Sequence, residues 1–181
     1  MELIDVYNNR HESMNYQKER KKLEDGEYRL SCFIWIINDR EEILLQQRLA
    51  TAKKMPNMWG TTAGGVISGE TSLNGAIREL REELGINVNK EELEFIGSNK
   101  RINDFVEVWL CRKNINISEL ILEPSEVQNA QWFSIKEFEK MLNEGTGIDS
   151  GYEIFKMYYD KFYDRHYEII DGKPVAIKNE K

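Results

Sequence analysis

The sequence predicts an α/β fold in which helices cover the faces of a mixed β-sheet. Segments rich in β-branched and aromatic residues occur both side by side across polar turns and separated by helical segments. Of the 181 residues, 40% are hydrophobic and 31% charged, a composition typical of a globular protein with a sizeable core. We expect one domain over 1–181, with an N-terminal arm or hairpin (1–29), a core with a C-terminal helix (30–167) and a loosely held tail (168–181).

The first 60 residues predict an arm, two strands and a loop. The alternating stretch LIDVY precedes a polar turn, which indicates a short hairpin or an extended arm, followed by a charged connector. Residues 28–39, YRLSCFIWIIND, predict a buried strand, and residues 41–48, EEILLQQR, follow a polar turn as its hairpin partner. Residues 50–60 predict a loop because Pro56 excludes a regular helix.

A helix is predicted over residues 71–84. Thr71 or Ser72 is placed to cap its N-terminus, and Gly85 is placed to end it. A rotation of about 100° per residue brings four apolar side chains to one face, which we expect to be buried. These residues are Leu73, Ile77, Leu80 and Leu84.

The far side of this helix is acidic. Glu79, Glu82 and Glu83 have i, i+3 and i+4 spacing, where each like-charge pair costs about 0.2–0.5 kcal/mol. Arg78 lies one turn before Glu82 and offsets part of this repulsion. Gly75 lies on the same side and would let a ligand approach the backbone. An acidic helix face of this kind is most often simply solvated.

Two neighbouring features favour a metal site over a solvated face. The preceding loop TTAGG contains two glycines, which suit a backbone bent around a ligand, and Glu70 adds a carboxylate at the helix entrance. Several carboxylate oxygens together suit Mg²⁺ or Mn²⁺. A divalent cation would remove the repulsion and bridge to phosphate oxygens, so the sequence predicts such a cation on the acidic face.

The chain beyond this helix predicts three more strands and two more helices. The strands are predicted at 92–101, 104–113 and 126–135. Ser134 is placed to cap the helix IKEFEKMLNEG, and a last amphipathic helix is predicted over 151–166.

Composition excludes several classes of function. The net charge of −7 argues against nonspecific binding to nucleic acid, which needs a basic face. No stretch predicts a membrane span or a signal peptide, so we expect a cytoplasmic protein without a membrane partner. Cys32 and Cys111 fit neither a disulfide framework nor a zinc motif and predict reduced core thiols. We assign no role to His11 and His166, which lie far from the acidic helix in sequence.

The acidic segment resembles a known motif. It resembles a complete Nudix box, with Gly64, five residues, Glu70, seven residues and then RELREELGI. The resemblance implies a Nudix-type α/β/α sandwich around a mixed sheet. It also implies hydrolysis of a nucleoside diphosphate linked to another moiety. Similar proteins hold metal with the carboxylates that match Glu79, Glu82 and Glu83, often with the backbone carbonyl that matches Ala63. Arg78 would orient a metal-binding glutamate.

The likeness extends over roughly residues 3 to 165. The pieces DGEYRL, FIWIIND, ILLQQR and AKKMPNMWG resemble Nudix hydrolases that are similar to isopentenyl diphosphate isomerases. This resemblance implies substrate-binding residues around the glycine loop. They are Arg48, Lys53, Lys54, Gly64, Gly65 and Trp59. Ordinary surface charge explains the three basic residues equally well, and Trp59 would either pack the loop or stack on a base.

Two alternatives to a hydrolase stay open. The first is an isomerase that acts on a prenyl diphosphate. The isomerase pattern has Cys-Gly-His where this chain has Ala63-Gly64-Gly65, so the thiol and the imidazole are missing there. A binding module that kept the fold and lost activity is the second alternative. The intact box acids argue against it, because a non-catalytic site has no need to retain their repulsion. We therefore expect a Nudix pyrophosphohydrolase.

The expected reaction is attack of water on a bridged diphosphate. Glu82 would position the water, and a carboxylate of a later loop would act as base, as in some relatives. Glu126 is the main candidate, with Glu123 and Glu107 as competitors. The substrate class stays open among nucleoside triphosphates, nucleoside diphosphates, nucleotide sugars and dinucleotides. The N-terminal arm and the last helix are candidate surfaces for a homodimer.

Overall fold

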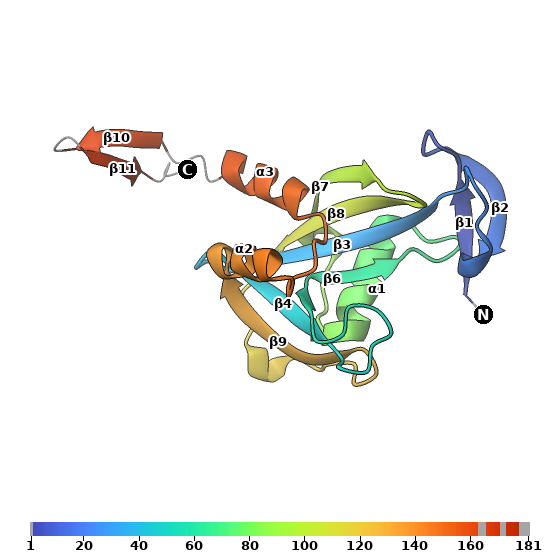
Figure 1. Cartoon of the computed structure of the whole chain (residues 1–181), viewed down its shortest axis with the longest axis horizontal. Coiled ribbons are helices and arrows are strands. Elements are labelled where there is room, and N and C mark those ends of the chain that lie inside the picture. Colours follow the sequence, from blue (N-terminus) through green and yellow to red (C-terminus); the bar gives the residue numbers. More distant parts are fainter. Residues whose placement is uncertain (1, 163–165, 171–172, 178–181) are drawn as a thin grey trace.

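The computed structural model describes residues 2–162 and the backbone of residues 166–170 and 173–177. Figure 1 shows a twisted central sheet with the acidic helix α1 behind it and helices α2 and α3 on the opposite side. This arrangement confirms the predicted α/β fold with a mixed sheet. Among the described residues, no helix is both long enough and apolar enough to cross a membrane.

The central sheet has seven strands in the described part of the chain. Its main path runs β5-β4-β3-β8-β7, with β6 paired to β3 and β9 paired to β4. The pair β3–β8 is parallel and all other pairs are antiparallel, so the sheet is mixed. The strands are β3 (Arg29–Ile37), β4 (Glu42–Arg48), β5 (Trp59–Gly60), β6 (Thr62–Gly65), β7 (Leu93–Lys100), β8 (Asp104–Arg112) and β9 (Val127–Ser134).

Strand β3 is buried on both faces because a hydrophobic core lies on each side of it. Its even-numbered residues, such as Cys32 and Ile34, pack with Leu80 of α1 (Ser72–Leu84). Its odd-numbered residue Trp35 stacks on Phe155 of α3 (Tyr152–Phe162) at 4.4 Å between ring centroids. The period of two in a strand produces this division. It explains why segment 28–39 has no polar face.

Helices α1 and α2 begin and end where their capping residues predict. The Thr71 side chain accepts a hydrogen bond from the Asn74 N–H, and Gly85 ends α1 with φ of 70°. Ser134 and Glu137 form a capping box at the start of α2 (Ile135–Glu144). These contacts satisfy backbone groups that a helix end leaves without partners.

The N-terminal segment forms a separate antiparallel hairpin, β1 (Leu3–Tyr7) with β2 (Ser13–Glu19), followed by the 3-10 helix η1 (Arg20–Lys22). Asp5 joins this hairpin to the loop before α1, accepting hydrogen bonds from Ser68 Oγ at 2.8 Å and from the Gly69 N–H at 2.9 Å. The hairpin therefore stands at one end of the sheet, next to the loop that leads into the acidic helix (Figure 1).

Two predicted elements differ from the structure. Strands β3 and β4 pair only at Ile37 with Ile43, because β6 takes the rest of this edge of β3 and β5 takes the rest of this edge of β4. The last helix ends at Phe162, and His166 begins strand β10 instead of continuing the helix. Strand β10 (His166–Ile170) pairs with β11 (Lys173–Ile177). The loosely held tail stays a prediction, and its residues 171–172 and 178–181 lie outside the described part.

Candidate active site

Helix α1 lies close to the sheet because small residues face it. Gly75 and Ala76 are buried, and a Cβ at Gly75 would lie 3.2 Å from Glu70 Oε2 and 3.6 Å from Cys32 Sγ. The expectation that Gly75 opens the backbone to a ligand is therefore wrong. Its missing side chain instead lets the helix pack against Cys32 on β3.

The acidic residues do not all face solvent. Glu83 is 5% exposed and the Glu79 side chain 13%, whereas the Glu82 side chain is 51% exposed. Leu73 and Ile77 of the predicted apolar face are only partly buried. The helix contacts β6 as well as β3, so its buried surface extends around to the acidic side. A single apolar stripe was therefore too simple a picture of this helix.

Arg78 is the centre of an ion-pair network. Its Nη1 donates to Glu79 at 2.7 Å and to Glu82 at 3.0 Å, and its Nη2 donates to Glu70 at 3.0 Å. The same Nη2 also donates to the Gly65 carbonyl at 3.0 Å. One guanidinium thus fixes three carboxylates and the backbone of the glycine loop.

Glu83 is a buried carboxylate with few partners. Gln46 Nε2 donates to its Oε2 at 2.8 Å, and the backbone of Ala63 provides a further hydrogen bond. Burial raises the pKa of Glu83 to about 8, and the nearby charges of Glu79 and Glu126 act in the same direction. Gln46 Oε1 is itself buried without a hydrogen-bond partner. Deprotonated Glu83 is therefore costly unless a cation lies beside it.

Gly64 is required by the position of Glu79. A Cβ built on Gly64 would lie 1.9 Å from Glu79 Oε1, so no other residue leaves this carboxylate in place. Burial raises the pKa of Glu79, although the hydrogen bond from Arg78 opposes that shift. The glycine loop and the acidic helix therefore fit together as one unit.

These groups line a hollow of about 540 Å³, which we call the acidic cavity. It brings together Glu79, Glu82 and Glu83 with the loop residues Ala63, Gly64 and Gly65. Across the described part of the chain, no three His, Cys, Asp or Glu side chains form a ready set of metal ligands. Glu79 and Glu82 both accept hydrogen bonds from Arg78, and Glu83 accepts one from Gln46. The predicted acids thus share one cavity without forming a preformed cluster.

The candidate bases separate clearly in space. Glu126 lines the acidic cavity and is close enough to raise the pKa values of Glu79 and Glu83. Glu123 instead accepts hydrogen bonds from Ser125 in its own turn. Glu107 accepts a hydrogen bond from Ser72 at the opposite end of α1. Of these three, only Glu126 is placed at the acidic cavity.

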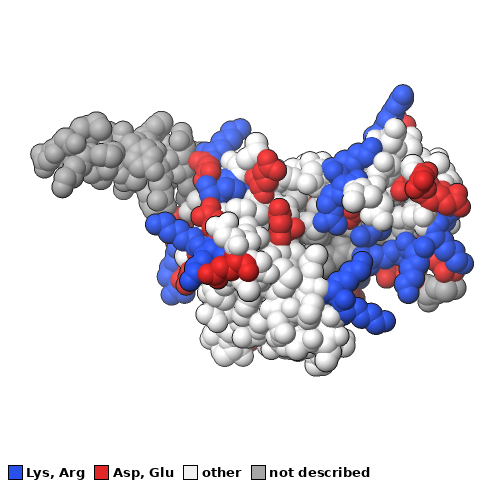
Figure 2. All heavy atoms as spheres, in the orientation of Figure 1, with Lys and Arg blue, Asp and Glu red and all other residues white. Residues whose placement is uncertain are grey.

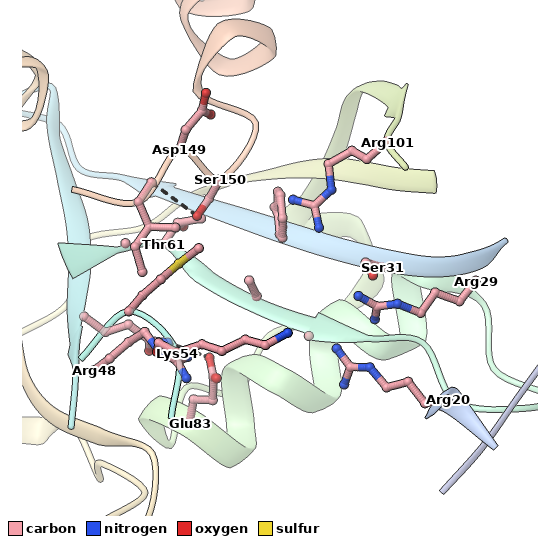
Figure 3. Close-up of a pocket in the computed structure, with 17 residues that line it drawn as sticks. Arg20, Arg29, Ser31, Arg48, Lys54, Thr61, Glu83, Arg101, Asp149 and Ser150 are labelled. Carbon is pink, nitrogen blue, oxygen red and sulfur yellow. Dashed lines mark hydrogen bonds between the residues drawn. The ribbon is translucent and has the colours of Figure 1, made fainter. Parts of the chain in front are cut away.

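A second hollow of about 350 Å³, which we call the basic cavity, adjoins the first. Figure 3 shows five basic side chains pointing into it from different segments. They are Arg20, Arg29, Arg48, Lys54 and Arg101. The two cavities share Arg20, Arg48, Ala63, Gly64 and Glu83 in their linings. The acidic and the basic cavity are therefore parts of one site.

The sequence predicted Arg48 and Lys54 for this site and missed Arg20, Arg29 and Arg101. Arg29 begins β3 and lies opposite Asp104 in the parallel β3–β8 register, an arrangement that no local pattern indicates. Arg20 lies in the connector between the N-terminal hairpin and β3, where a charged run predicts only a solvated segment.

Two predicted substrate residues are not brought to these cavities. Lys53 is exposed and lines neither of them. The Trp59 ring packs edge-on against Phe133 at 4.9 Å between centroids, and Trp59 also lines neither cavity. Trp59 was expected either to pack or to stack on a base, and the structure shows packing contacts.

The residues of the acidic cavity fit a divalent cation by their chemistry. Two largely buried carboxylates have raised pKa values, and a third negative charge acts on both. Hard oxygen donors of this kind suit Mg²⁺ and Mn²⁺, and a bound cation would offset their repulsion. Nudix hydrolases in general use divalent metal ions, in agreement with this chemistry.

Comparisons with known proteins agree with the geometry. The family model described as NUDIX domain matches residues 27–151. An uncharacterized Nudix hydrolase of Listeria monocytogenes, lmo0368, is 32% identical over 129 residues, which cover 71% of this chain and 76% of that protein. The Nudix hydrolase 3 of Arabidopsis thaliana is 29% identical, and the match covers 90% of this chain and 23% of that protein.

Among solved structures, the DR0079 protein of Deinococcus radiodurans has the same fold. Its TM-score is 0.72 at 20% identity, and the match covers 87% of this chain and 99% of that one. Because the family model covers more than half of the chain, and the sequence relatives are named Nudix hydrolases, the family is established. The chain belongs to the NUDIX family and is a Nudix hydrolase, an enzyme class that acts on phosphoric anhydride bonds.

Proposed function

We propose that the protein hydrolyses the diphosphate linkage of a nucleoside diphosphate joined to another moiety. The observation that carries this proposal is the shared wall between the two cavities. Gly64 and Glu83 line both, so carboxylates suited to a cation lie beside cations suited to phosphate. A site that binds a metal–diphosphate complex needs both kinds of group in contact.

We propose Mg²⁺ as the cation, with Mn²⁺ as an alternative, held by Glu79, Glu82, Glu83 and the Ala63 carbonyl. When bound, such a cation neutralises phosphate oxygens and lowers the pKa of a bound water. Arg78 orients the glutamates, because it already holds Glu79 and Glu82 by hydrogen bonds. Removing Arg78 would therefore disturb both carboxylates together.

The remaining steps are assigned to residues of the acidic cavity. Glu82 orients the attacking water, and the Glu126 carboxylate takes the proton that this water releases. The water oxygen forms a bond to one phosphorus while the bridging P–O bond breaks, and the second phosphate leaves with the bridging oxygen. Glu126 lines the acidic cavity, and this position supports its role as base.

Arg48 and Lys54 are proposed to bind the diphosphate, with Gly64 and Gly65 providing a close backbone approach. Arg48 lines both cavities, and its Nε donates to the Lys54 carbonyl at 3.1 Å, which orders the loop between them. Lys53 and Trp59 keep their proposed substrate roles only if the loop 50–60 rearranges around substrate.

An isomerase-like enzyme is the second candidate, because of the resemblance to the subgroup similar to isopentenyl diphosphate isomerases. Cys32 lies directly opposite Gly64 in the β3–β6 pair, so a thiol is nearer to the glycine loop than the sequence indicated. The Cys32 side chain is fully buried in the core under α1, and burial raises its pKa to about 12. These facts support hydrolysis over isomerisation.

The proposal is tested by a hydrolysis screen of the intact chain with Mg²⁺ or Mn²⁺. The substrates are nucleoside triphosphates, nucleoside diphosphates, nucleotide sugars and dinucleotides, and Glu79→Gln is the control. We expect metal-dependent release of a nucleoside monophosphate or of phosphate. Tight nucleotide binding without any turnover would contradict the proposal and favour a non-catalytic binding module. Conversion of isopentenyl diphosphate would favour the isomerase.

The location of the protein in the cytoplasm and its assembly into a homodimer stay predictions.

A further inference from the structure

Three arginines converge at the end of the basic cavity that lies across from Arg48 (Figure 3). Arg20 comes from η1, Arg29 from the start of β3, and Arg101 from the turn between β7 and β8. A Cβ on Gly65 would lie 3.4 Å from Arg20 Nη1 and 3.5 Å from Arg29 Nη1. Two guanidinium groups therefore approach the same point on the glycine loop. Figure 2 shows blue side chains gathering on this part of the surface, beside the N-terminal hairpin.

The positive charge of this group is only partly balanced. Asp104 is 1% exposed and accepts two hydrogen bonds from Arg101 at 2.9 Å and one from Arg29 Nη2 at 3.3 Å. Ser31 donates a fourth at 3.1 Å, so both oxygens of Asp104 accept hydrogen bonds. Glu2 attracts Arg29 more weakly. Arg29 and Arg101 thus share one closely bound carboxylate, which Arg20 does not contact.

Unused donors remain in the cavity. Arg29 Nη1 is buried without a hydrogen-bond partner, which is costly for a charged donor. Within the part of the chain that the structure describes, the Arg20 side chain forms no hydrogen bond or ion pair. Burial lowers the pKa of Arg29, and the charges of Arg20 and Arg101 lower it further. An anion between these side chains would satisfy the orphan donor and remove the repulsion.

The planar forks of arginine match phosphate oxygens. Figure 3 shows this end of the basic cavity across from Arg48 and Glu83, where the reacting diphosphate is proposed to lie. Arg20 and the glycine loop border both parts of the site. We propose that Arg20, Arg29 and Arg101 bind a second phosphate group, a phosphomonoester that the substrate carries apart from the diphosphate. This inference rests on the proposed function for the position of the diphosphate.

The N-terminal hairpin is then part of the substrate site. Arg20 lies outside residues 27–151, which the family model matches. The hairpin reaches the site because Asp5 holds the loop before α1 and Tyr7 bridges to Tyr28 just before β3. Specificity for the extra phosphate would therefore depend on a segment outside the family's matched region.

A binding experiment tests the site without catalysis. Inorganic phosphate is titrated into the intact chain by calorimetry, in a chelator and at constant ionic strength. Arg20→Gln should weaken phosphate binding about tenfold, because a charge-assisted hydrogen bond is lost. Arg20 is exposed and unpaired, so the fold should survive the change. The control Lys21→Gln removes the same charge from the neighbouring exposed residue, which lines neither cavity, and should leave binding unchanged.

Arg29→Lys is a second variant, since it keeps the charge but removes the fork. It should also weaken phosphate binding, with circular dichroism to verify that the fold is intact. Absence of phosphate binding by the parent chain would overturn the proposal. Equal binding by the Arg20→Gln and Lys21→Gln variants would overturn it as well.

A kinetic experiment asks whether the phosphate belongs to the substrate. Two pairs of diphosphates differ only by one phosphomonoester, namely coenzyme A with dephospho-coenzyme A and NADPH with NADH. The parent should show a kcat/KM about tenfold higher for the phosphorylated member of at least one pair. Arg20→Gln should remove this preference by raising KM for that member only. Equal kcat/KM for both members of both pairs overturns the proposal, even where phosphate itself binds.

The two proposals fail in different ways. If no diphosphate is hydrolysed but phosphate binding follows Arg20 and Arg29, the hydrolase function fails and the anion site stands. If diphosphates are hydrolysed without any preference or any effect of Arg20→Gln, the function stands and the anion site fails.

Discussion

The two cavities concentrate opposite charges, and the chain assembles them in opposite ways. The acidic cavity takes its carboxylates mainly from one helix, where Glu79, Glu82 and Glu83 are close because they are close in sequence. The basic end is assembled from Arg20, Arg29 and Arg101, which only the sheet brings together. The first is visible as a local motif, whereas the second depends on strand register.

The difference also appears in how each charge cluster is restrained. On the acidic side, one cation, Arg78, holds several carboxylates. On the basic side, one carboxylate, Asp104, holds two guanidinium groups. Each cluster thus keeps an excess of its own charge, which suits a substrate and a cation of the opposite charges. The five predictions below test this symmetry, from the largest expected effect to the smallest.

Neutralising the buried acids should have the largest effect. Glu79→Gln and Glu83→Gln each keep the shape of the side chain but remove a proposed metal ligand. We expect each to lower the rate of metal-dependent hydrolysis by on the order of a hundredfold, the scale found when one charge-stabilising group leaves a site. Circular dichroism should show an intact fold. Near-normal turnover in both variants would mean that the acidic face carries no catalytic metal.

Neutralising Asp104 should affect stability instead of catalysis first. Asp104→Asn leaves Arg29 and Arg101 without their buried counter-charge, and we expect a loss of about 3 kcal/mol in the free energy of unfolding by urea. Glu144→Gln, which breaks an exposed pair with Lys140, should cost less than about 0.5 kcal/mol. Equal costs in the two variants would show that Asp104 does not restrain the arginines.

The same variant has a pH signature. Burial alone would raise the pKa of Asp104, but the hydrogen bond and charge of Arg101, with Arg29 and Ser31, lower it below the usual 3.8. A lowered pKa contributes stability that is complete above the unfolded value and is lost as the pH falls through the folded value. The stability difference between parent and Asp104→Asn should therefore shrink below about pH 4. A constant difference down to pH 2 would contradict this.

Metal should stabilise the acidic side by a slightly smaller amount. A cation that binds only the folded chain adds about 2.7 kcal/mol at a hundred times its Kd. The triple variant Glu79→Gln, Glu82→Gln, Glu83→Gln should melt no lower than the metal-free parent, because the repulsion is gone. It should lose the rise in melting temperature with Mg²⁺. A full rise in the triple variant would place the cation elsewhere.

The smallest expected effect comes from two adjacent glycines. Gly64→Ala places a Cβ where Glu79 Oε1 lies, so it should displace that carboxylate and reduce hydrolysis about tenfold. Gly65→Ala would meet Arg20 and Arg29 at ordinary contact distance and should reduce hydrolysis less than Gly64→Ala does. Neither glycine has a positive φ, so backbone strain does not confuse the comparison. Equal loss in both variants would refute the fit of Glu79 against Gly64.

Much of the fold could be predicted from sequence because its signals are local. Capping residues fixed the start of α1 and α2, and β-branched runs located β3 and β8. The burial of Glu83 could not be predicted, because an amphipathic pattern assumes one buried face and α1 has contacts beyond that face. The open pairing of β3 and β4 was also missed, since a short polar turn indicates a full hairpin.

The site was predicted in the same uneven way. The Nudix-like motif located Glu79, Glu82, Glu83 and Arg78 in one cavity, because a helix fixes neighbours three and four residues apart. The position of Arg29 beside Asp104 follows from the parallel register of β3 and β8, which one sequence does not reveal. Residues whose partners lie across the sheet are therefore the ones that needed the structure.

Strands β3 and β4 share only one residue pair, and this has a consequence for the newly made chain. Strand β4 carries the buried residues Ile43, Leu44 and Leu45, but it meets β3 at a single pair and depends on β9 along its length. At about 5–20 residues per second, the ribosome needs several seconds to reach β9 after β4 has been made. During that interval β4 is an apolar strand with an open edge. Chains released before Val127 should therefore aggregate or occupy chaperones.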